Sequence, residues 1–316
     1  MRRCALLFAF VSLCLPITVF SQARTPDAAI SHFKNASKKI DNGDLDGAIE
    51  EYTRAITLSS HLEGFNSSKR LGNSFDDYSA EEIKVIDPFT ANAYNNRCLV
   101  RYKKSDFQGA VEDCNEALRI RPGLPSAFLN RAAALRGMGE IEAARKDLDR
   151  AIALKKDFPQ AYSNRGSLRL DNGDVNGALE DLNRAIELTD RIPESYYQRG
   201  FTYIALKKYE QAVADFDRAI KLAPDMAWAY EGRGTAFMQL EKMDKAIPDF
   251  TRAIELDPQI VWAYYNRGLS RVYIGKESDA VNDFSECLKL RPDLKAELDA
   301  KIELAKQLRE HKKPLQ

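Results

Sequence analysis

Apolar and polar residues alternate between residues 91 and 294 with the spacing of short amphipathic helices, and the pattern returns every 34 residues. Each repeat carries an aromatic residue, two variable residues, an arginine and a small residue, in that order. The aromatic residues are Tyr94, Phe128, Tyr162, Tyr196, Tyr230 and Tyr264. A constant period of this length, divided into two amphipathic segments, predicts pairs of antiparallel helices stacked into a solenoid.

Two positions of the repeat are small in all six copies, when Ala91 is counted as position 1. Position 8 holds Cys98, Ala132, Gly166, Gly200, Gly234 and Gly268, and position 20 holds alanine throughout. Facing each other across the turn, these residues let the two helices of a pair approach to about 8–10 Å. Position 24 is occupied by leucine or phenylalanine in five repeats. We expect it to fill the core of each pair together with the aromatic residue at position 4.

Proline marks the ends of the repeats. Position 32 holds Pro88, Pro122, Pro224, Pro258 and Pro292. Because proline lacks an N–H and fixes φ, it is expected to end one helix before the next begins. Two repeats lack this proline, and the repeats that follow them open with Pro159 and Pro193, which suit the first turn of a helix.

The motifs Tyr162-Ser-Asn-Arg-Gly166 and Asp181-Leu-Asn-Arg-Ala-Ile186 resemble the tetratricopeptide repeat (TPR) family. The resemblance implies an all-α fold, a right-handed α-solenoid of antiparallel helix pairs closed by a capping helix. Its six full repeats are residues 91–124, 125–158, 159–192, 193–226, 227–260 and 261–294. A weaker first repeat lies within residues 24–62, and residues 295–316 are expected to form the amphipathic capping helix and the tail.

The first repeat is interrupted. Ala55 and Ile83 both fit position 27, so the register is displaced by 28 residues. Residues 63–90 are therefore expected to be an insertion that completes this repeat. Glycine, asparagine and serine residues predict a projecting loop there, followed by a helix start with capping-box chemistry at Ser79 to Glu82. The loop is either a tolerated surface insertion or a ligand contact.

Residues 1–23 have the composition of a secretory signal peptide: Arg2 and Arg3, an apolar run from Cys4 to Phe20, and small residues at Ser21 and Ala23. An uncleaved membrane anchor is the alternative, but the run is short for a bilayer span. Cys14 follows leucine rather than the small residue typical of a lipid-attachment site. We expect an exported protein, periplasmic in a bacterium or secreted.

Three cysteines follow the signal segment: Cys98, Cys114 and Cys287. The interpretation favoured by the sequence is that all three are small core hydrophobes. Because Cys98 and Cys114 stand on facing helices of one repeat, a disulfide between them is the alternative in an oxidising compartment.

Arginine at position 7 and aspartate at position 23 recur in all six full repeats. The arginines are Arg97, Arg131, Arg165, Arg199, Arg233 and Arg267, and the aspartates are Asp113, Asp147, Asp181, Asp215, Asp249 and Asp283. We expect a structural ladder of ion pairs, because the counter-charge recurs with the cation. A row of arginines that binds anions is the alternative.

The first helix of each repeat is expected to line a concave groove that binds the partner. Asparagine recurs at position 6, and aromatic residues collect in the second half of the groove. The candidate contact residues are Asn96, Asn130, Asn164, Asn266, Tyr197, Phe201, Trp228, Trp262, Tyr265 and Tyr273. The asparagines look like the ladder by which TPR proteins hold an extended peptide, with local capping or solvation as the alternative. The tryptophans are candidate hot spots, although packing between repeats could absorb the aromatic residues.

The chain has 47 basic and 47 acidic residues, so no global field would draw it to nucleic acid or an anionic membrane. The repeats leave little sequence for a catalytic domain, and we expect no enzyme activity, cofactor or metal site. The TPR resemblance implies a protein-binding scaffold for a peptide or protein segment, an adaptor of the cell envelope. The alternative is a structural module that self-associates.

Overall fold

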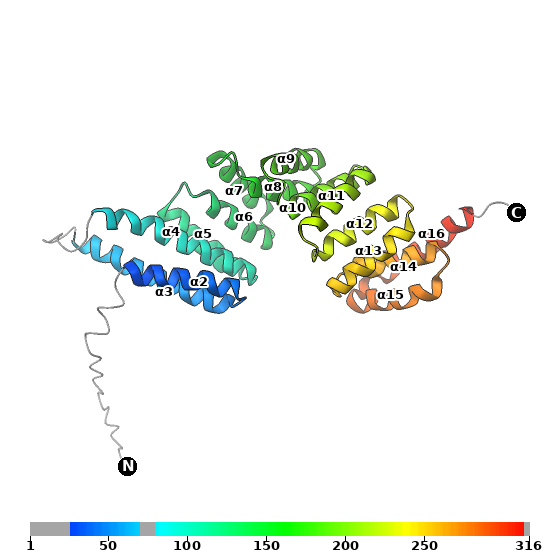
Figure 1. Ribbon diagram of the computed structural model, residues 1–316, viewed down its shortest axis with the longest axis horizontal. Helices are drawn as coiled ribbons and strands as arrows, with labels where there is room; N and C mark the ends of the chain where they lie inside the picture. Colours follow the sequence, from blue (N-terminus) through cyan, green and yellow to red (C-terminus); the bar gives the residue numbers. More distant parts are fainter. Residues whose placement is uncertain (1–25, 70–79, 313–316) are drawn as a thin grey trace, which may run out of the picture. The chain divides into compact units, whose positions relative to one another are not determined.

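The computed structural model describes residues 26–69 and 80–312, which are helical nearly throughout and contain no strand. The segment expected to be a signal peptide lies outside these described residues. Consecutive helices pack in antiparallel pairs (Figure 1). The all-α solenoid expected from the 34-residue period is confirmed, and the chain divides into two compact units at Leu154.

The first unit consists of three helix pairs. They are α2 (Pro26–Asp41) with α3 (Leu45–Lys69), α4 (Ala80–Lys103) with α5 (Phe107–Ile120), and α6 (Pro125–Gly137) with α7 (Ile141–Leu154). In each pair we call the first helix A and the second helix B. Aspartate side chains cap two of the B helices, because Gly47 N donates to Asp44 Oδ1 at 2.8 Å and Gly109 N donates to Asp106 Oδ1 at 3.0 Å.

The second unit consists of four helix pairs and a terminal helix. They are α8 (Pro159–Asp171) with α9 (Val175–Leu188), α10 (Pro193–Ala205) with α11 (Tyr209–Leu222), α12 (Ala227–Gln239) with α13 (Met243–Leu256), and α14 (Val261–Tyr273) with α15 (Glu277–Leu290). A 3-10 turn (Pro292–Leu294) leads into α16 (Lys295–Lys312). Pro159 and Pro193 open their helices as expected.

The insertion expected as a loop is helical wherever the structure describes it. Helix α3 continues to Lys69, beyond the expected end of the first repeat, and α4 begins at Ala80 and runs through Pro88. Ser59 is accommodated within this helix, where its hydroxyl donates back to the carbonyl of Ala55 at 2.7 Å. A proline removes one helical hydrogen bond without necessarily ending the helix. Phe89, the next residue, packs on Phe33 of α2 with ring centroids 5.2 Å apart.

The small residue at position 8 makes room chiefly for the residue at position 24. A Cβ added to Gly200 would lie 2.8 Å from the ring of Phe216, and one added to Gly166 would lie 2.8 Å from Leu182 and 3.2 Å from the carbonyl of Ala178 at position 20. The expected partner of position 24 was the aromatic residue at position 4. That expectation is wrong in the fifth repeat, where Phe216 packs edge-on against Tyr197 and Phe201 at positions 5 and 9.

Helix α16 covers the end of the last repeat. Leu298 is fully buried, and it packs in one cluster with Leu294, Cys287 and Tyr265. The expected capping helix is therefore present, and its inner face belongs to the core of the second unit.

Candidate functional site

Each arginine at position 7 binds the aspartate at position 23 of its own helix pair. In five repeats the Nε and Nη2 atoms of the arginine donate to the two carboxylate oxygens at 2.6–2.8 Å. In the last repeat, Arg267 donates to Asp283 at 2.7 and 3.1 Å. The aspartates are buried. This fork geometry fixes the distance between the two helices of a pair.

The third nitrogen also reaches the preceding repeat in Arg97, Arg131, Arg199, Arg233 and Arg267. Arg131 Nη1 donates to Asn115 at 2.7 Å, and Arg199 Nη1 donates to Asn183 at 2.8 Å. A cavity of about 240 Å³ beside Arg131 would be the place for an anion in the alternative interpretation. All three nitrogens of that guanidinium group are already bound to protein, so the contacts favour a structural role.

Three of the asparagines at position 6 bind the preceding repeat, two of them through its A helix and Asn96 through its B helix α3. Asn130 Nδ2 donates to Asn95 Oδ1 at 3.0 Å, Asn266 Nδ2 donates to Glu231 Oε1 at 3.1 Å, and Asn96 Nδ2 donates to the hydroxyl of Tyr52 at 3.3 Å. Of the four, Asn164 is exposed. Three of the side chains that were expected to bind a peptide backbone thus donate hydrogen bonds to other residues of the protein.

Three of the aromatic residues expected in the groove contribute to packing. Tyr197 and Phe201 contact Phe216 in the core of the fifth repeat. Tyr265 is only 5 % exposed, and its hydroxyl donates to Glu297 Oε1 of α16 at 3.1 Å. The expectation that Tyr265 contacts a partner is wrong, because the capping helix covers it. Burial raises the pKa of Tyr197 to about 12, with the nearby carboxyl of Glu231 as a smaller cause.

The two tryptophans remain on the surface. Trp228 is 43 % exposed and Trp262 is 40 % exposed. Both stand at position 2 of consecutive A helices, α12 and α14, and the ring of Trp262 packs edge-on against Tyr265 with centroids 5.4 Å apart. Large apolar side chains held in this way on neighbouring helices form a preorganised contact surface.

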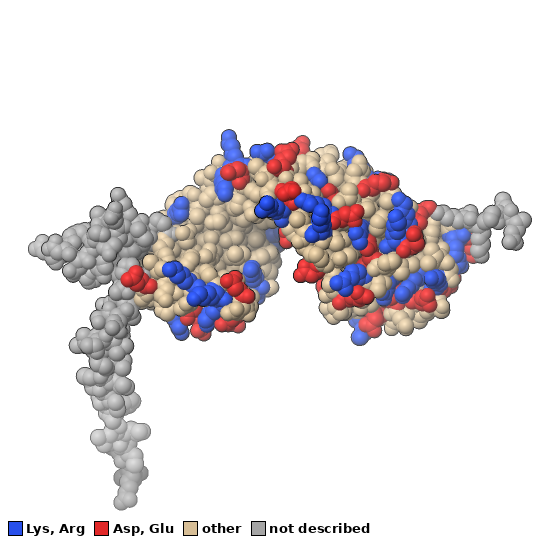
Figure 2. All heavy atoms as spheres, in the orientation of Figure 1, with Lys and Arg blue, Asp and Glu red and all other residues tan. Residues whose placement is uncertain are grey.

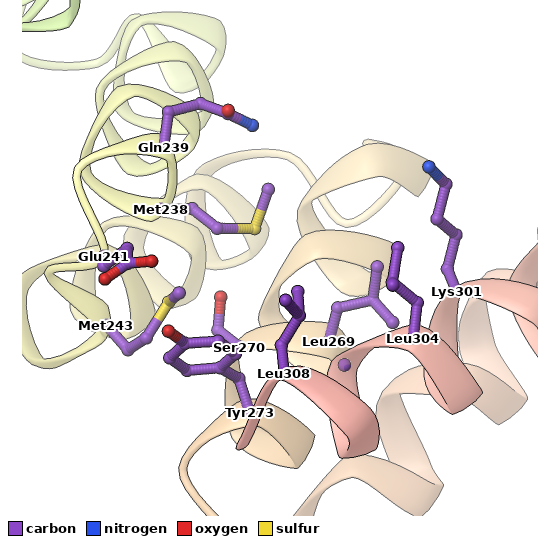
Figure 3. A pocket seen from close by; sticks show the side chains of 11 residues that line it. Met238, Gln239, Glu241, Met243, Leu269, Ser270, Tyr273, Lys301, Leu304 and Leu308 are labelled. Atoms are coloured by element: carbon purple, nitrogen blue, oxygen red, sulfur yellow. The ribbon is translucent and has the colours of Figure 1, made fainter. Parts of the chain in front are cut away.

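A hollow continues from the same two helices to the capping helix. It encloses about 290 Å³. Met238 of α12 and Tyr273 of α14 lie on one side, and Leu304 and Leu308 of α16 lie on the other (Figure 3). Tyr273 was expected at the partner surface, and the structure places it here. The lining is mainly apolar, as in pockets that receive an apolar side chain.

Glu231 of α12 is a residue that the sequence analysis did not single out. It is only 5 % exposed, and its carboxylate accepts hydrogen bonds from Thr235 Oγ1 at 2.9 Å and Asn266 Nδ2 at 3.1 Å. Burial raises the pKa of this carboxyl. One signal could have found it: Glu231 is the acidic residue at position 5, which the other full repeats fill with asparagine, leucine, serine or tyrosine.

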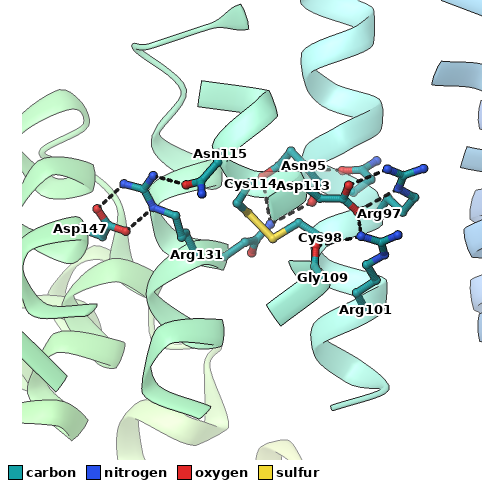
Figure 4. Close-up of a disulfide and its surroundings, with 12 residues drawn as sticks. Asn95, Arg97, Cys98, Arg101, Gly109, Asp113, Cys114, Asn115, Arg131 and Asp147 are labelled. Carbon is teal, nitrogen blue, oxygen red and sulfur yellow. Dashed lines mark hydrogen bonds and ion pairs between the residues drawn. A yellow bond between two sulfur atoms is a disulfide. The ribbon is translucent and has the colours of Figure 1, made fainter. Parts of the chain in front are cut away.

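Cys98 and Cys114 are joined by a disulfide between α4 and α5, with their Cα atoms 5.6 Å apart (Figure 4). The sequence analysis favoured two free thiols, and the structure corrects that preference. Positions 8 and 24 are direct neighbours, as Gly200 and Phe216 show, which brings the two sulfur atoms within bonding reach. Cys287 is a buried free thiol.

Charged side chains of both signs are mixed on the surface. Figure 2 shows acidic and basic residues side by side over α11 to α15. Among the described residues, no helix is long and apolar enough to cross a membrane. No group of three potential metal ligands occurs in that part of the chain.

Comparison with known families connects this geometry to a named repeat. Two family models described as tetratricopeptide repeats match residues 129–193, 193–226 and 227–260. Residues 193–226 and 227–260 each coincide with one helix pair of the structure, and residues 129–193 cover most of the two pairs from α6 to α9. The chain is a tetratricopeptide repeat protein. Outside the matched segments, α4 with α5 and α14 with α15 carry the same arginine–aspartate pair, so the TPR pattern extends beyond them.

Solved structures of TPR proteins share the fold. A tetratricopeptide repeat protein from Parabacteroides merdae is 17 % identical, with a TM-score of 0.56 over 89 % of this chain and 98 % of its own. A chain of the APC/C hetero-tetramer Cut9–Hcn1 is 13 % identical, with a TM-score of 0.63 over 88 % of this chain and 58 % of its own. At these identities the likeness concerns the TPR fold alone. A comparison with curated proteins found no match.

Proposed function

We propose that this chain is a non-enzymatic interaction scaffold that holds a peptide or protein segment on the face formed by α10, α12 and α14. The observation that carries the proposal is the exposure of Trp228 and Trp262 at equivalent positions of consecutive repeats. TPR repeats supply extended helical surfaces for partners. Aromatic residues dominate the energetics of such interfaces when a partner covers them.

Trp262 is suited to anchor a partner because the structure already fixes its surroundings. Trp262 rests against Tyr265, which is itself held by Glu297. A rigid anchor loses little conformational entropy on binding, so more of the contact energy appears as affinity. The mainly apolar hollow at Met238 extends the same surface and offers a place for a second side chain of the partner.

We propose further that the scaffold works outside the cytoplasm, in a periplasm or as a secreted adaptor. The composition of residues 1–23 supports export. The disulfide between Cys98 and Cys114 supports it independently, because such bonds persist chiefly in oxidising compartments.

Affinity capture from an extract of the cell envelope tests the scaffold. The wild-type protein is compared with the double variant Trp228→Ala, Trp262→Ala, and with the control Val281→Ala, which alters an exposed apolar residue on the B helix α15. We expect the partner to be lost from the tryptophan variant and retained by the control. Equal recovery by both variants, with unchanged circular dichroism, would exclude this surface as the binding site.

Self-association through α16 is the second candidate function. Leu304 and Leu308 of this helix are 45 % and 47 % exposed and line the hollow. Because Leu298 is buried, truncation at Pro292 would disturb the core, and point variants are the better test. Self-association predicts a molecular mass in solution that increases with protein concentration, and an increase that disappears in the double variant Leu304→Gln, Leu308→Gln. A monomer at every concentration would exclude self-association and leave the scaffold function as the explanation.

A further inference from the structure

Glu231 differs from the other buried carboxylates of the described residues in lacking a cationic partner. Each of the others pairs with an arginine or a histidine. These pairs are Glu51 with His32, Asp113 with Arg97, Asp147 with Arg131, Asp181 with Arg165, Asp215 with Arg199, Asp249 with Arg233, and Asp283 with Arg267. Glu231 has only the neutral donors of Thr235 and Asn266. A buried carboxylate without a cation is costly, so its presence calls for a reason.

The free oxygen of Glu231 is available to a ligand. Both hydrogen bonds end on Oε1, and Oε2 has no partner within the described parts of the chain. Oε2 is also not one of the fully buried side-chain atoms that lack a hydrogen bond, so it retains contact with the surface. The carboxylate therefore keeps one acceptor position open while Thr235 and Asn266 hold its orientation.

Glu231 lies on the same helix faces as the proposed anchors. On α12 the helical spacing places Trp228, Glu231 and Met238 on one side. On α14 it does the same for Trp262 and Asn266. The hydrogen bond from Asn266 to Glu231 brings these two faces together. The surface thus runs from two exposed indole rings, past a carboxylate oxygen, to the apolar hollow.

A carboxylate next to exposed indole rings is a combination that attracts cations. An ammonium or guanidinium group gains a charge-assisted hydrogen bond from the carboxylate. Indole faces add cation–π attraction and cover the aliphatic stem of the side chain. Partial burial strengthens both contributions, because solvent screens them less. A neutral or acidic side chain would leave the carboxylate uncompensated.

We propose that Glu231 receives a lysine or arginine side chain of the partner segment, between Trp228 and Trp262, and that the hollow at Met238 receives an apolar side chain. This inference rests on the proposed scaffold function and names the chemistry of its partner. Glu231 and Met238 are seven residues apart on α12, which corresponds to about 10 Å along a helix. An extended segment advances about 3.3 Å per residue, so the basic and the apolar residue of the partner are about three positions apart.

Selection from a random dodecapeptide library displayed on phage tests the inference. We expect wild-type protein to enrich peptides with lysine or arginine about three positions from a bulky apolar residue. The chain has only two tryptophans, both at this surface, so their fluorescence reports the binding of a synthetic enriched peptide directly. Glu231→Gln keeps an acceptor for Thr235 and Asn266 but removes the charge, and it should weaken binding at least about tenfold. Glu210→Gln, on the B helix α11, is the matched control and should bind normally.

A change in the peptide separates recognition from folding. Replacing its basic residue by norleucine should weaken binding to the wild type by a larger factor than binding to Glu231→Gln, where only the cation–π contribution of the tryptophans is lost. Enriched peptides that depend on the tryptophans but need no basic residue would overturn this inference and leave the scaffold function standing. If no enriched peptide depends on Trp228 and Trp262, both proposals fail.

Discussion

Cys98 and Cys114 are bonded at the two repeat positions where the fifth repeat packs Gly200 against Phe216. In both cases position 8 on helix A faces position 24 on helix B. The fifth repeat fills the contact with a buried aromatic ring, whereas the second repeat closes it with a covalent bond. The same junction of the TPR hairpin is thus stabilised by two different kinds of interaction.

Reduction of this disulfide is expected to destabilise the first unit. The bond spans 16 residues, and closing a loop of that length contributes about 3 kcal/mol by restricting the unfolded chain. Thermal unfolding followed by circular dichroism, with and without dithiothreitol, measures the effect. The double variant Cys98→Gly, Cys114→Leu reproduces the pair Gly166 and Leu182 of the fourth repeat. Its melting curve should not respond to the reductant, and a wild-type curve that is equally insensitive would contradict the stabilising role.

Gly200→Ala is expected to lower the free energy of unfolding by about 1–2 kcal/mol. The strain from crowding the core is expected to outweigh the stabilisation from the higher helix propensity of alanine. The added Cβ would lie 2.8 Å from the ring of Phe216. That ring cannot move away freely, because it is fully buried and also lies against Gly232. Urea unfolding compares this variant with Gly123→Ala, where a Cβ would meet open space. If both variants have the stability of the wild type, the contact at position 8 is not tightly packed.

The sequence predicted the features that recur, because each is decided within one repeat. The helix pairs followed from the 34-residue period, and the arginine–aspartate spacing pointed to the contact between Arg199 and Asp215. Contacts specific to one place were missed. Tyr265 is buried by α16, whose Glu297 lies 32 residues further along the chain. The repeat pattern does not predict this contact, because α16 lies outside the repeats. Pro88 was expected to end a helix, but packing of the adjacent Phe89 on the first repeat accompanies its continuation.

Arg199→Ala is expected to destabilise the second unit by about 3 kcal/mol, since it leaves the buried carboxylate of Asp215 without its cation. Arg252→Ala is the comparison. Its ion pair with Glu255 is exposed by about half on both sides and is screened by solvent, so its loss should cost much less than the loss of Arg199. Unfolding in urea at neutral pH measures both. Equal effects of the two variants would show that the ladder contributes no more than surface charge pairs.

The buried carboxyl of Glu231 is expected to make stability fall as pH rises. Burial raises its pKa in the folded protein above that of the unfolded chain, which is near 4.3. At a pH below the pKa of the unfolded chain, the carboxyl group is protonated in both states and does not lower the stability. As the pH rises through the folded pKa, the unfolded chain releases the proton more readily, and stability is lost. Glu231→Gln should therefore have the same melting temperature as the wild type at acidic pH and a higher melting temperature at neutral pH. The difference in melting temperature, measured across this range and compared with that of Glu210→Gln, isolates the buried group. A difference that stays constant with pH would show that Glu231 is ionised in the folded protein as readily as in the unfolded chain.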